Sequence, residues 1–188
     1  MTLSNLLNAT LRTGRPYVQK AAFAALYRQA YPHVFRYAYA LRGGPAAEVE
    51  DLVAETFLRA WTHRGSFDGT PDAAVGWLIT IARRLVIDQH RRASRQPALV
   101  DASAIEPVAP QELDAAFQRQ EHTETVVAIL QRLGDADREL LTLRYILGWP
   151  VRRIADHQQK SQNAVSVALR RALDRAREQL AAIQGGRP

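Results

Sequence analysis

The sequence EVEDLVAETFLRAW, from Glu48 to Trp61, decides the fold of this chain. Apolar side chains and one threonine recur in it at spacings of three and four residues, which is the period of an amphipathic helix with one buried stripe. The members of the stripe are Val49, Leu52, Val53, Thr56, Phe57, Ala60 and Trp61. We therefore predict a helix that buries one side, with the neighbouring segments arranged around it.

Acidic side chains lie on the other side of this predicted helix. Glu48, Asp51 and Glu55 form an acidic ridge, concentrated in the first turns. Carboxylates there suit the positive end of the helix dipole. Periodicity alone favours an ordinary solvated face, because charge on the outside of a helix is the default. A binding role for the acidic ridge depends on the motifs that surround it.

Length and composition restrict the class of protein. The 188 residues are enough for one sizeable domain or two small ones. The chain has no Cys, which excludes disulfides, thiolate catalysis and the usual zinc sites. No run of about 18 apolar residues occurs, and residues 1–20 show no small-residue cleavage pattern. These features predict a soluble, cytoplasmic protein.

Charge divides the chain into four stretches. Residues 1–20 carry three cations and no acid and have no clear period, which indicates a loosely ordered leader. Residues 21–92 and 115–188 are two basic lobes with helical spacing. Residues 93–114 contain three prolines, one cation and four acids, and this linker cannot bury enough surface to fold alone. We predict an all-α protein with two small helical domains joined by a flexible linker.

The apolar spacing also predicts where the other helices lie. In the first lobe it places them at 21–41, with a bend or restart at Pro32, and at 73–92. In the second lobe it places them at 113–133, 138–147, 151–158 and from 161 to about 183. Asp135 is the predicted N-cap of the second of these, and Gly148 ends it.

The loop from Arg64 to Val75 is rich in turn-forming residues and aromatic side chains. A nucleic-acid base that leaves its stack needs apolar or aromatic walls and backbone polar groups. Phe67, Trp77 and the glycine backbone could supply them. Alternatively both rings fill the core under the loop, which we favour for Trp77.

The helix predicted at 73–92 is strongly basic near its end. Its cations are Arg83, Arg84, Arg91 and Arg92, with His90 beside them. Cations at fixed positions can hold a phosphate strand, and each neutralised phosphate releases counterions. Arg83 and Arg84 can instead pair with Asp88 at helical spacing, so the residues leave both interpretations open.

The second lobe contains a helix-turn-helix pattern. Val151, Ile154 and Ala155 give its first helix a buried face, and Ser161 is a suitable N-cap for the second. The stripe of the second helix is Val165, Leu169, Ala172 and Leu173. On the opposite side, polar residues are placed to enter a major groove or to meet phosphates. These are Gln162, Asn163, Ser166 and Arg170 for base edges, and Arg171 and Arg175 for the backbone.

Several of these segments resemble bacterial sigma factors. The first lobe is similar to region 2 of the sigma-70 family, specifically the extracytoplasmic-function (ECF) group. The matching words are Asp51-Leu52-Val53, Glu55 to Trp61, Trp77-Leu78, Ile81-Ala82-Arg83 and Asp88 to Arg92. The second lobe is similar to region 4, through Leu141 to Tyr145, Arg171-Ala172 and Arg175 to Leu180.

The resemblance implies an alternative sigma factor, which is not an enzyme and needs no cofactor. Its partners would be promoter DNA, the β′ clamp helices and β flap of core RNA polymerase, and in some cases an anti-sigma factor, without membrane insertion. The implied polymerase-binding residues are Glu48, Asp51, Leu52, Glu55 and Leu58. Residues implied at the −10 element are Phe67, Asp68, Gly69, Arg83, Arg84, Asp88, Arg91 and Arg92. Residues implied at the −35 element are Arg152, Arg153, Ser161, Gln162, Asn163, Ser166, Arg170, Arg171 and Arg175. The linker would thread the active-site and RNA-exit channels of the polymerase.

The helix-turn-helix departs from the family pattern. Gln158-Gln159-Lys160 stands where relatives have an apolar residue, a glycine and another apolar residue, so the glycine that tolerates a positive φ is missing. Pro150 replaces the usual hydroxyl cap, and Arg152 and Arg153 replace acids at a helix start. We expect these arginines to contact the −35 backbone, and the lobe to be less stable than in relatives or to dock differently.

Two other classes of protein compete with a sigma factor. A free-standing helix-turn-helix DNA-binding regulator needs no acidic docking helix, and such proteins commonly bind paired half-sites as dimers. An enzyme is disfavoured, since the five histidines show no metal spacing and no phosphate loop or nucleophile motif occurs. We therefore expect neither a catalytic residue nor a metal site.

Overall fold

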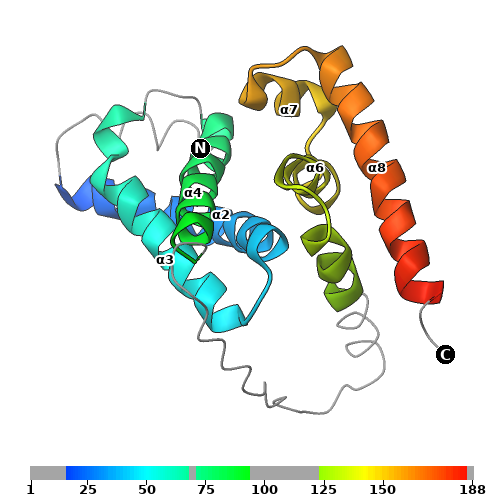
Figure 1. The fold of residues 1–188 in the computed structure, drawn as a ribbon. Coiled ribbons are helices and arrows are strands. Elements are labelled where there is room, and N and C mark those ends of the chain that lie inside the picture. Colours follow the sequence, from blue (N-terminus) through cyan, green and yellow to red (C-terminus); the bar gives the residue numbers. More distant parts are fainter. Residues whose placement is uncertain (1–15, 68–70, 94–122, 186–188) are drawn as a thin grey trace, which may run out of the picture. The chain divides into compact units, whose positions relative to one another are not determined.

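The computed structural model describes residues 16–67, 71–93 and 123–185, and every regular element in these ranges is a helix (Figure 1). The protein is all-α, as predicted. Its described residues form two compact units, 16–38 with 46–93 and 39–45 with 123–185. Within the described ranges, no helix is both long enough and apolar enough to cross a membrane.

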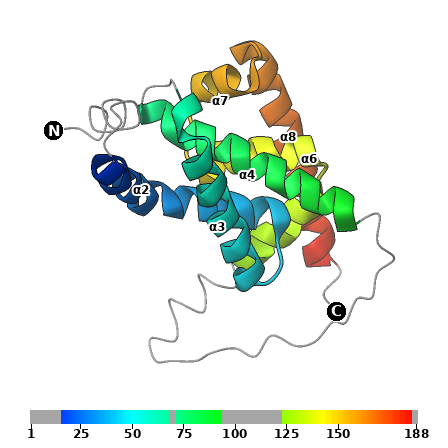
Figure 2. The same cartoon turned by 90° about the vertical axis from the view of Figure 1, so that its left-hand side faces the viewer.

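The first unit contains most of α2 (Pro16–Arg42), with α3 (Ala46–Thr62), a short 3-10 turn η1 (Arg64–Ser66) and α4 (Pro71–Ala93). Figures 1 and 2 show α3 and α4 packed side by side. Residues 16–20, predicted as part of a loose leader, are helical. Pro32 lies inside α2 without ending it. Because Pro32 is exposed, water can satisfy the carbonyl that it leaves without a donor.

The stripe of α3 forms the centre of this unit, as predicted. All its members except the half-buried Trp61 are buried. Thr56 is tolerated there because its Oγ1 donates a hydrogen bond of 2.8 Å to the carbonyl of Leu52. The stripe shares the core of the unit with buried residues of α2 and α4: Val34, Tyr37, Leu78, Ile79 and Ala82.

The second unit contains a helical segment at 123–131, α6 (Asp135–Leu141), a π-helical turn η2 (Thr142–Ile146), α7 (Val151–Gln158) and α8 (Gln162–Gly185). The helix predicted at 138–147 therefore starts earlier and changes type part-way. The start predicted at Leu113 lies outside the described residues. The bounds predicted for α7 are confirmed.

The two ends of the α6 and η2 segment were predicted with different success. Asp135 was wrong as the N-cap, because Gly134 takes that position and its carbonyl accepts from the amides of Asp137 and Arg138 at 3.0 Å. Gly148 does end the segment, with φ of +68°. Thr142 is fully buried at the start of η2, and its hydroxyl has no hydrogen-bond partner among the described residues.

Arg138 is a charged residue inside the second unit, only 8% exposed. Its guanidinium donates hydrogen bonds to the carbonyls of Leu130 and Leu133, both 2.9 Å, Leu41 at 3.1 Å and Gln131 at 3.2 Å. These carbonyls lie in or just beyond the last turns of the segment at 123–131 and of α2, where helix dipoles are negative. The guanidinium of Arg138 thus donates hydrogen bonds to several carbonyls that have no donor within their own helices.

Candidate nucleic-acid and partner interfaces

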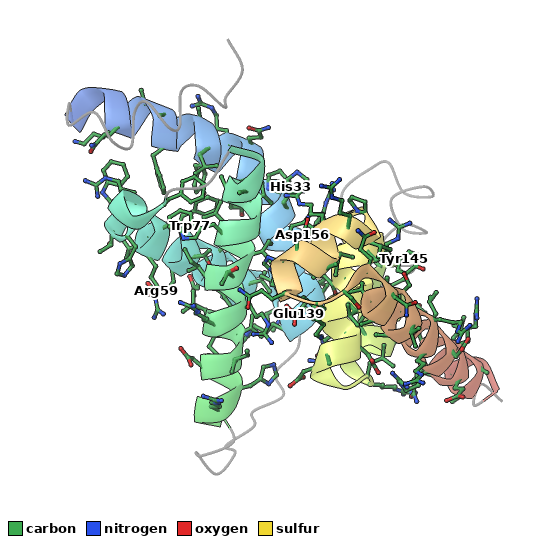
Figure 3. The ribbon with its side chains drawn as sticks, turned by 90° about the horizontal axis from the view of Figure 1, so that it is seen from above. His33, Arg59, Trp77, Glu139, Tyr145 and Asp156 are labelled. Atoms are coloured by element: carbon green, nitrogen blue, oxygen red, sulfur yellow. The ribbon has the colours of Figure 1, made fainter. Side chains whose placement is uncertain are left out.

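The acidic ridge of α3 is accessible to a partner. Glu48 and Asp51 are exposed. Glu55 is half-exposed and accepts a hydrogen bond of 2.7 Å from Nε of Arg59, a residue of α3 labelled in Figure 3. Leu58, on the same outer side, is 60% exposed, which is unusual for a leucine on a helix with a well-filled core. The ridge therefore combines carboxylates with one exposed apolar side chain.

Leu52 does not belong to this surface. It was expected to bind the polymerase, yet its side chain is 1% exposed and lies in the core of the first unit. That expectation was wrong because the resemblance assigned polymerase binding to residues throughout the motif, although the motif contributes residues to both the buried and the exposed side of the helix. Leu52 supports α3 from inside.

Glu50 is an exposed acid on α3 that the prediction left out. Its charge acts on Tyr31 of α2. Burial is the main cause that raises the pKa of the Tyr31 phenol above its usual range, and the negative charge of Glu50 raises the same pKa further. Glu50 thus extends the negative surface beyond the acidic ridge, toward α2.

The basic side of α4 faces solvent. Arg83, Arg84, Asp88, His90 and Arg91 are exposed, and Arg92 also lies in α4. The opposite side of the helix is buried, through Ala74, Leu78, Ile79, Ala82, Leu85 and Val86. Four of the expected −10 contacts are therefore brought to one accessible face. Asp68 and Gly69 lie outside the described residues.

Phe67 lies in the core of the first unit and not at its surface. Its side chain is 7% exposed, and its ring centroid is 5.0 Å from that of Trp77, a residue of α4 labelled in Figure 3. The interpretation that these rings fill the core under the loop therefore fits Phe67 as well as Trp77. To contact an unstacked base, the buried side chain of Phe67 would first have to become exposed.

Helices α7 and α8 form the helix-turn-helix that the sequence indicated. They pack against each other and bury Ile154, Ala155, Val165, Leu169 and Ala172. Oγ of Ser161 accepts a hydrogen bond of 3.1 Å from the amide of Ala164, which confirms Ser161 as the N-cap of α8. The outer side of α8 is open to solvent at Gln162, Asn163, Ser166, Arg170 and Arg171. The hydroxyl of Ser166 donates to the carbonyl of Gln162 at 2.9 Å, so this donor is used inside the helix.

Arg175 is engaged within the second unit. Its Nε and one terminal nitrogen donate to the two carboxylate oxygens of Asp137 at 2.6 and 2.7 Å, which ties α8 to α6. This hydrogen bonding is the main cause that raises the pKa of Arg175. A phosphate contact would have to compete with this two-pronged ion pair, and the expected contact of Arg175 with the DNA backbone stays a prediction.

The arginines that begin α7 differ in their surroundings. Arg152 is exposed, whereas the guanidinium of Arg153 lies 4.1 Å from the centre of the Trp149 ring. The same ring packs against His157 nearly at right angles, with centroids 5.2 Å apart. Trp149 is buried and was not singled out from the sequence. A cation over an aromatic ring gains about 0.5 to 2 kcal/mol, which offsets the unfavourable helix dipole at this position.

The turn between α7 and α8 keeps the backbone of a glycine without having one. Gln159 has φ of 54° and ψ of 44°, in the left-handed region. The amide of Lys160 donates to the carbonyl of Ala155 at 2.9 Å, and that of Gln159 donates to Asp156 at 3.3 Å. These two bonds form a Schellman helix end, which favours glycine at the position that Gln159 occupies. The substitution therefore strains the backbone and leaves its path unchanged.

Comparison with known proteins agrees with both units. A family model described as Sigma-70 region 2 matches residues 26–96, and one described as Sigma-70, region 4, matches residues 123–175. The ECF RNA polymerase sigma factor SigL of Mycobacterium tuberculosis is 34% identical over 146 residues, which cover 76% of this chain and 80% of SigL. The chain belongs to the ECF sigma factors. It is thus an alternative sigma factor of the sigma-70 family, with core RNA polymerase and promoter DNA as partners.

Other relatives of this sigma factor show the same family and fold. The ECF sigma factor BldN of Streptomyces coelicolor is 34% identical over 158 residues, which cover 81% of this chain and 58% of BldN. Among solved structures, CnrH in complex with the cytosolic domain of CnrY is similar over the whole of both chains, with a TM-score of 0.65 and 24% identity. RpoE of Bartonella quintana, in complex with the anti-sigma factor NepR, gives a TM-score of 0.64 at 23% identity and covers 84% of this chain and 96% of its own. At these identities the two solved structures support the fold alone.

Proposed function

We propose that this sigma factor docks on core polymerase through the acidic ridge of α3 together with Leu58. The exposure of Leu58 carries the proposal, because a leucine gains nothing from water and gains about 2 kcal/mol when a partner covers it. The carboxylates around it add charge that steers a basic partner and fixes its orientation. The β′ clamp helices are the surface of the polymerase that the resemblance assigns to this role.

Charge reversal tests the docking surface. Asp51→Lys should weaken co-purification with core polymerase by about tenfold, which corresponds to about 1.4 kcal/mol. Glu178→Lys, on an exposed position of α8, changes the net charge by the same amount and serves as the control. Both variants should keep the circular dichroism of the parent because both positions are exposed. Unchanged polymerase binding by Asp51→Lys would contradict the docking assignment.

We propose that the exposed side of α4 holds the −10 element. Arg83, Arg84 and Arg91 can meet phosphates while the buried side of the helix fixes their positions. Asp88 lies on the same exposed side and can accept a hydrogen bond from a cytosine amino group or from a neighbouring arginine. Arg84→Ala should weaken promoter binding more at low salt than at high salt, because the variant releases fewer counterions on binding and its affinity falls less steeply as salt rises.

We propose that the start of α8 reads the −35 element in the major groove. Gln162 and Asn163 stand in the first turn, beside the capped end of the helix, with amide groups suited to base edges. Arg152, Arg170 and Arg171 are placed for phosphates, and Ser161 adds its hydroxyl near the same end. The guanidinium of Arg153 lies over the Trp149 ring, so Arg153 would contact a phosphate either from that position or after moving away from the ring.

Two kinds of variant separate base contacts from phosphate contacts. Asn163→Ala should weaken promoter binding by about 1 to 3 kcal/mol. Changes of the base pair that Asn163 contacts should then have little further effect on binding by the variant. Arg171→Ala should weaken every promoter alike and lower the salt dependence by about one counterion. Arg177→Ala is the control, since Arg177 is paired with Asp174 at 2.9 Å further along α8. If Asn163→Ala weakens binding to all promoters equally, the assignment of Asn163 to the major groove is wrong.

We propose that this protein acts in the cytoplasm and is held inactive by an anti-sigma factor. Two proteins of similar fold are found in complexes of their own, CnrH with the cytosolic domain of CnrY and RpoE with the anti-sigma factor NepR, and the proposal extends this arrangement to the present chain. The linker at 93–114 stays a prediction, because residues 94–122 lie outside the described part of the chain. Tight duplex binding by the purified protein, without any effect on run-off transcription by core polymerase, would instead favour a free-standing regulator.

A further inference from the structure

Five aromatic rings of α2 and α3 form a continuous band, and part of this aromatic band faces solvent. The ring of Tyr27 lies 5.5 Å from that of Tyr31 and 4.6 Å from that of Phe57, measured between centroids. The ring of Phe23 lies 6.3 Å from that of Phe57 and 5.0 Å from that of Trp61. Phe57 is buried, and the other rings are partly exposed, most of all Tyr27 at 41%. The outer side of the band is therefore open to a further element.

The surroundings of the aromatic band suit an apolar helix better than a nucleic acid. Ala24 lies one turn before Tyr27 on α2, and it is exposed. Ala54 has the same place on α3, one turn before Phe57. Small side chains beside large ones let a second helix approach closely. The carboxylate of Glu50, whose charge acts on the phenol of Tyr31, opposes the approach of a phosphate.

The leader offers a segment of suitable chemistry. Residues 1–15 precede α2 and lie outside the described part of the chain. Although residues 1–20 together have no clear period, four leucines of the leader fall at spacings that give a helix one apolar side. These are Leu3, Leu6, Leu7 and Leu11. Glycine just after one helix and proline at the first position of the next are typical of two consecutive helices, and Gly14 and Pro16 fit this pattern. The sequence thus predicts a turn at 14–16.

The leucines and the rings lie at equal distances from the predicted turn. Leu3 lies 11 residues before its first residue, and Tyr27 lies 11 residues after its last residue. Leu7 and Phe23 each lie 7 residues from the same two ends. With a helical rise of about 1.5 Å per residue, both members of a pair lie about 16 Å or about 10 Å from the turn. A helix that folds back antiparallel to α2 would therefore bring these leucines beside the corresponding rings.

We propose that residues 3–13 form a helix that docks on the aromatic band and covers Tyr27 with its leucines. Because the docking segment belongs to the same chain, its effective concentration is high and a small apolar surface is sufficient to hold it. Arg12, in the last turn of this helix, suits the negative end of the helix dipole. None of the polymerase or promoter contacts proposed above involves the leader, so its docking and the sigma-factor role can fail independently.

Disulfide cross-linking of the full chain tests the docking, because the parent has no cysteine. The test variant combines Leu6→Cys with Ala24→Cys, which are each 8 residues from the predicted turn and leave Tyr27 in place. The control combines Leu6→Cys with Gln29→Cys, since Gln29 is exposed on another side of α2 and closes a loop of similar length. With oxidised glutathione as the oxidant, the intramolecular disulfide of the test variant should form at least about tenfold faster than that of the control. Equal rates would overturn the proposal, and so would cross-links formed only between molecules, which would make a second copy the occupant of the band.

Hydrogen exchange provides a second measurement, without cysteines. The amides from Leu7 to Thr13 in the full chain should exchange at least about tenfold more slowly than in a peptide of residues 1–15. Leu7→Asp should remove this protection because it places a charge against the rings. Asn8→Asp is the matched control, since it adds the same charge on the polar side of the predicted helix and should keep the protection. Protection that survives Leu7→Asp, or that is missing from the parent, would show that the leader does not dock on the aromatic band.

Discussion

Replacing Gln159 by glycine should stabilise the second unit. The residue sits at φ of 54°, where a side chain costs about 1 to 2 kcal/mol and glycine costs almost nothing. Glycine also gives the unfolded chain more freedom, which removes about 0.4 to 1 kcal/mol of that gain. A net stabilisation of about 0.5 to 1 kcal/mol remains, because Gln159 is exposed and its side chain packs little.

Native-state hydrogen exchange of the α7 and α8 amides measures this effect in the second unit alone. The slowest amides of Gln159→Gly should exchange about two- to fivefold more slowly than those of the parent, as a gain of 0.5 to 1 kcal/mol requires. Gln158→Gly is the matched control, since it places the same residue at the last position of α7, where φ is not positive, and should lower the stability of the second unit. If both variants change exchange in the same direction, backbone strain at Gln159 is not the cause.

Four further substitutions separate packing from surface roles. Leu52→Ala should lower the free energy of unfolding by about 2 to 5 kcal/mol, because it removes a buried side chain. Leu58→Ala should change that free energy by less than about 0.5 kcal/mol and still weaken polymerase binding. If urea unfolding shows the larger loss for Leu58→Ala, the assignment of the buried and exposed faces is wrong. Thr142→Val should raise the stability of the second unit by about 1 kcal/mol, since it removes a buried hydroxyl without a partner; a loss in hydrogen-exchange protection would show a partner that the structure lacks. Asp137→Ala should lower the thermal midpoint, and the loss should shrink at high salt because an ion pair is removed; a salt-independent loss would point to packing instead.

Local periodicity was sufficient to predict much of the fold. The α3 stripe, the bounds of α7 and the cap at Ser161 follow from side-chain spacing and from the chemistry of one hydroxyl, both of which act over a few residues. Comparison with the family pattern, and not periodicity, showed that the turn after α7 lacks the usual glycine. It could not show that the backbone would nevertheless keep the left-handed conformation at Gln159.

Features that depend on distant partners were missed. The carbonyls that hold Arg138 include one from Leu41, far away in sequence, so no local pattern indicates that this cation is buried. Arg175 looked like a phosphate ligand because Asp137 is on another helix. Leu52 was assigned to the surface through a motif, although its own spacing already placed it in the buried stripe. For Leu52 the helical period was the better guide.

The π-helical turn at Thr142–Ile146 determines the direction in which the chain continues toward α7. A π turn holds one residue more than an α turn, so the chain leaves it rotated by about 100° relative to a regular helix of the same span. Deleting a single residue there would restore a regular helix and swing the segment that leads to α7 around the axis of α6. Homologues that differ in length at this point should therefore carry the helix that corresponds to α8 at another angle, even where every residue of that helix is the same.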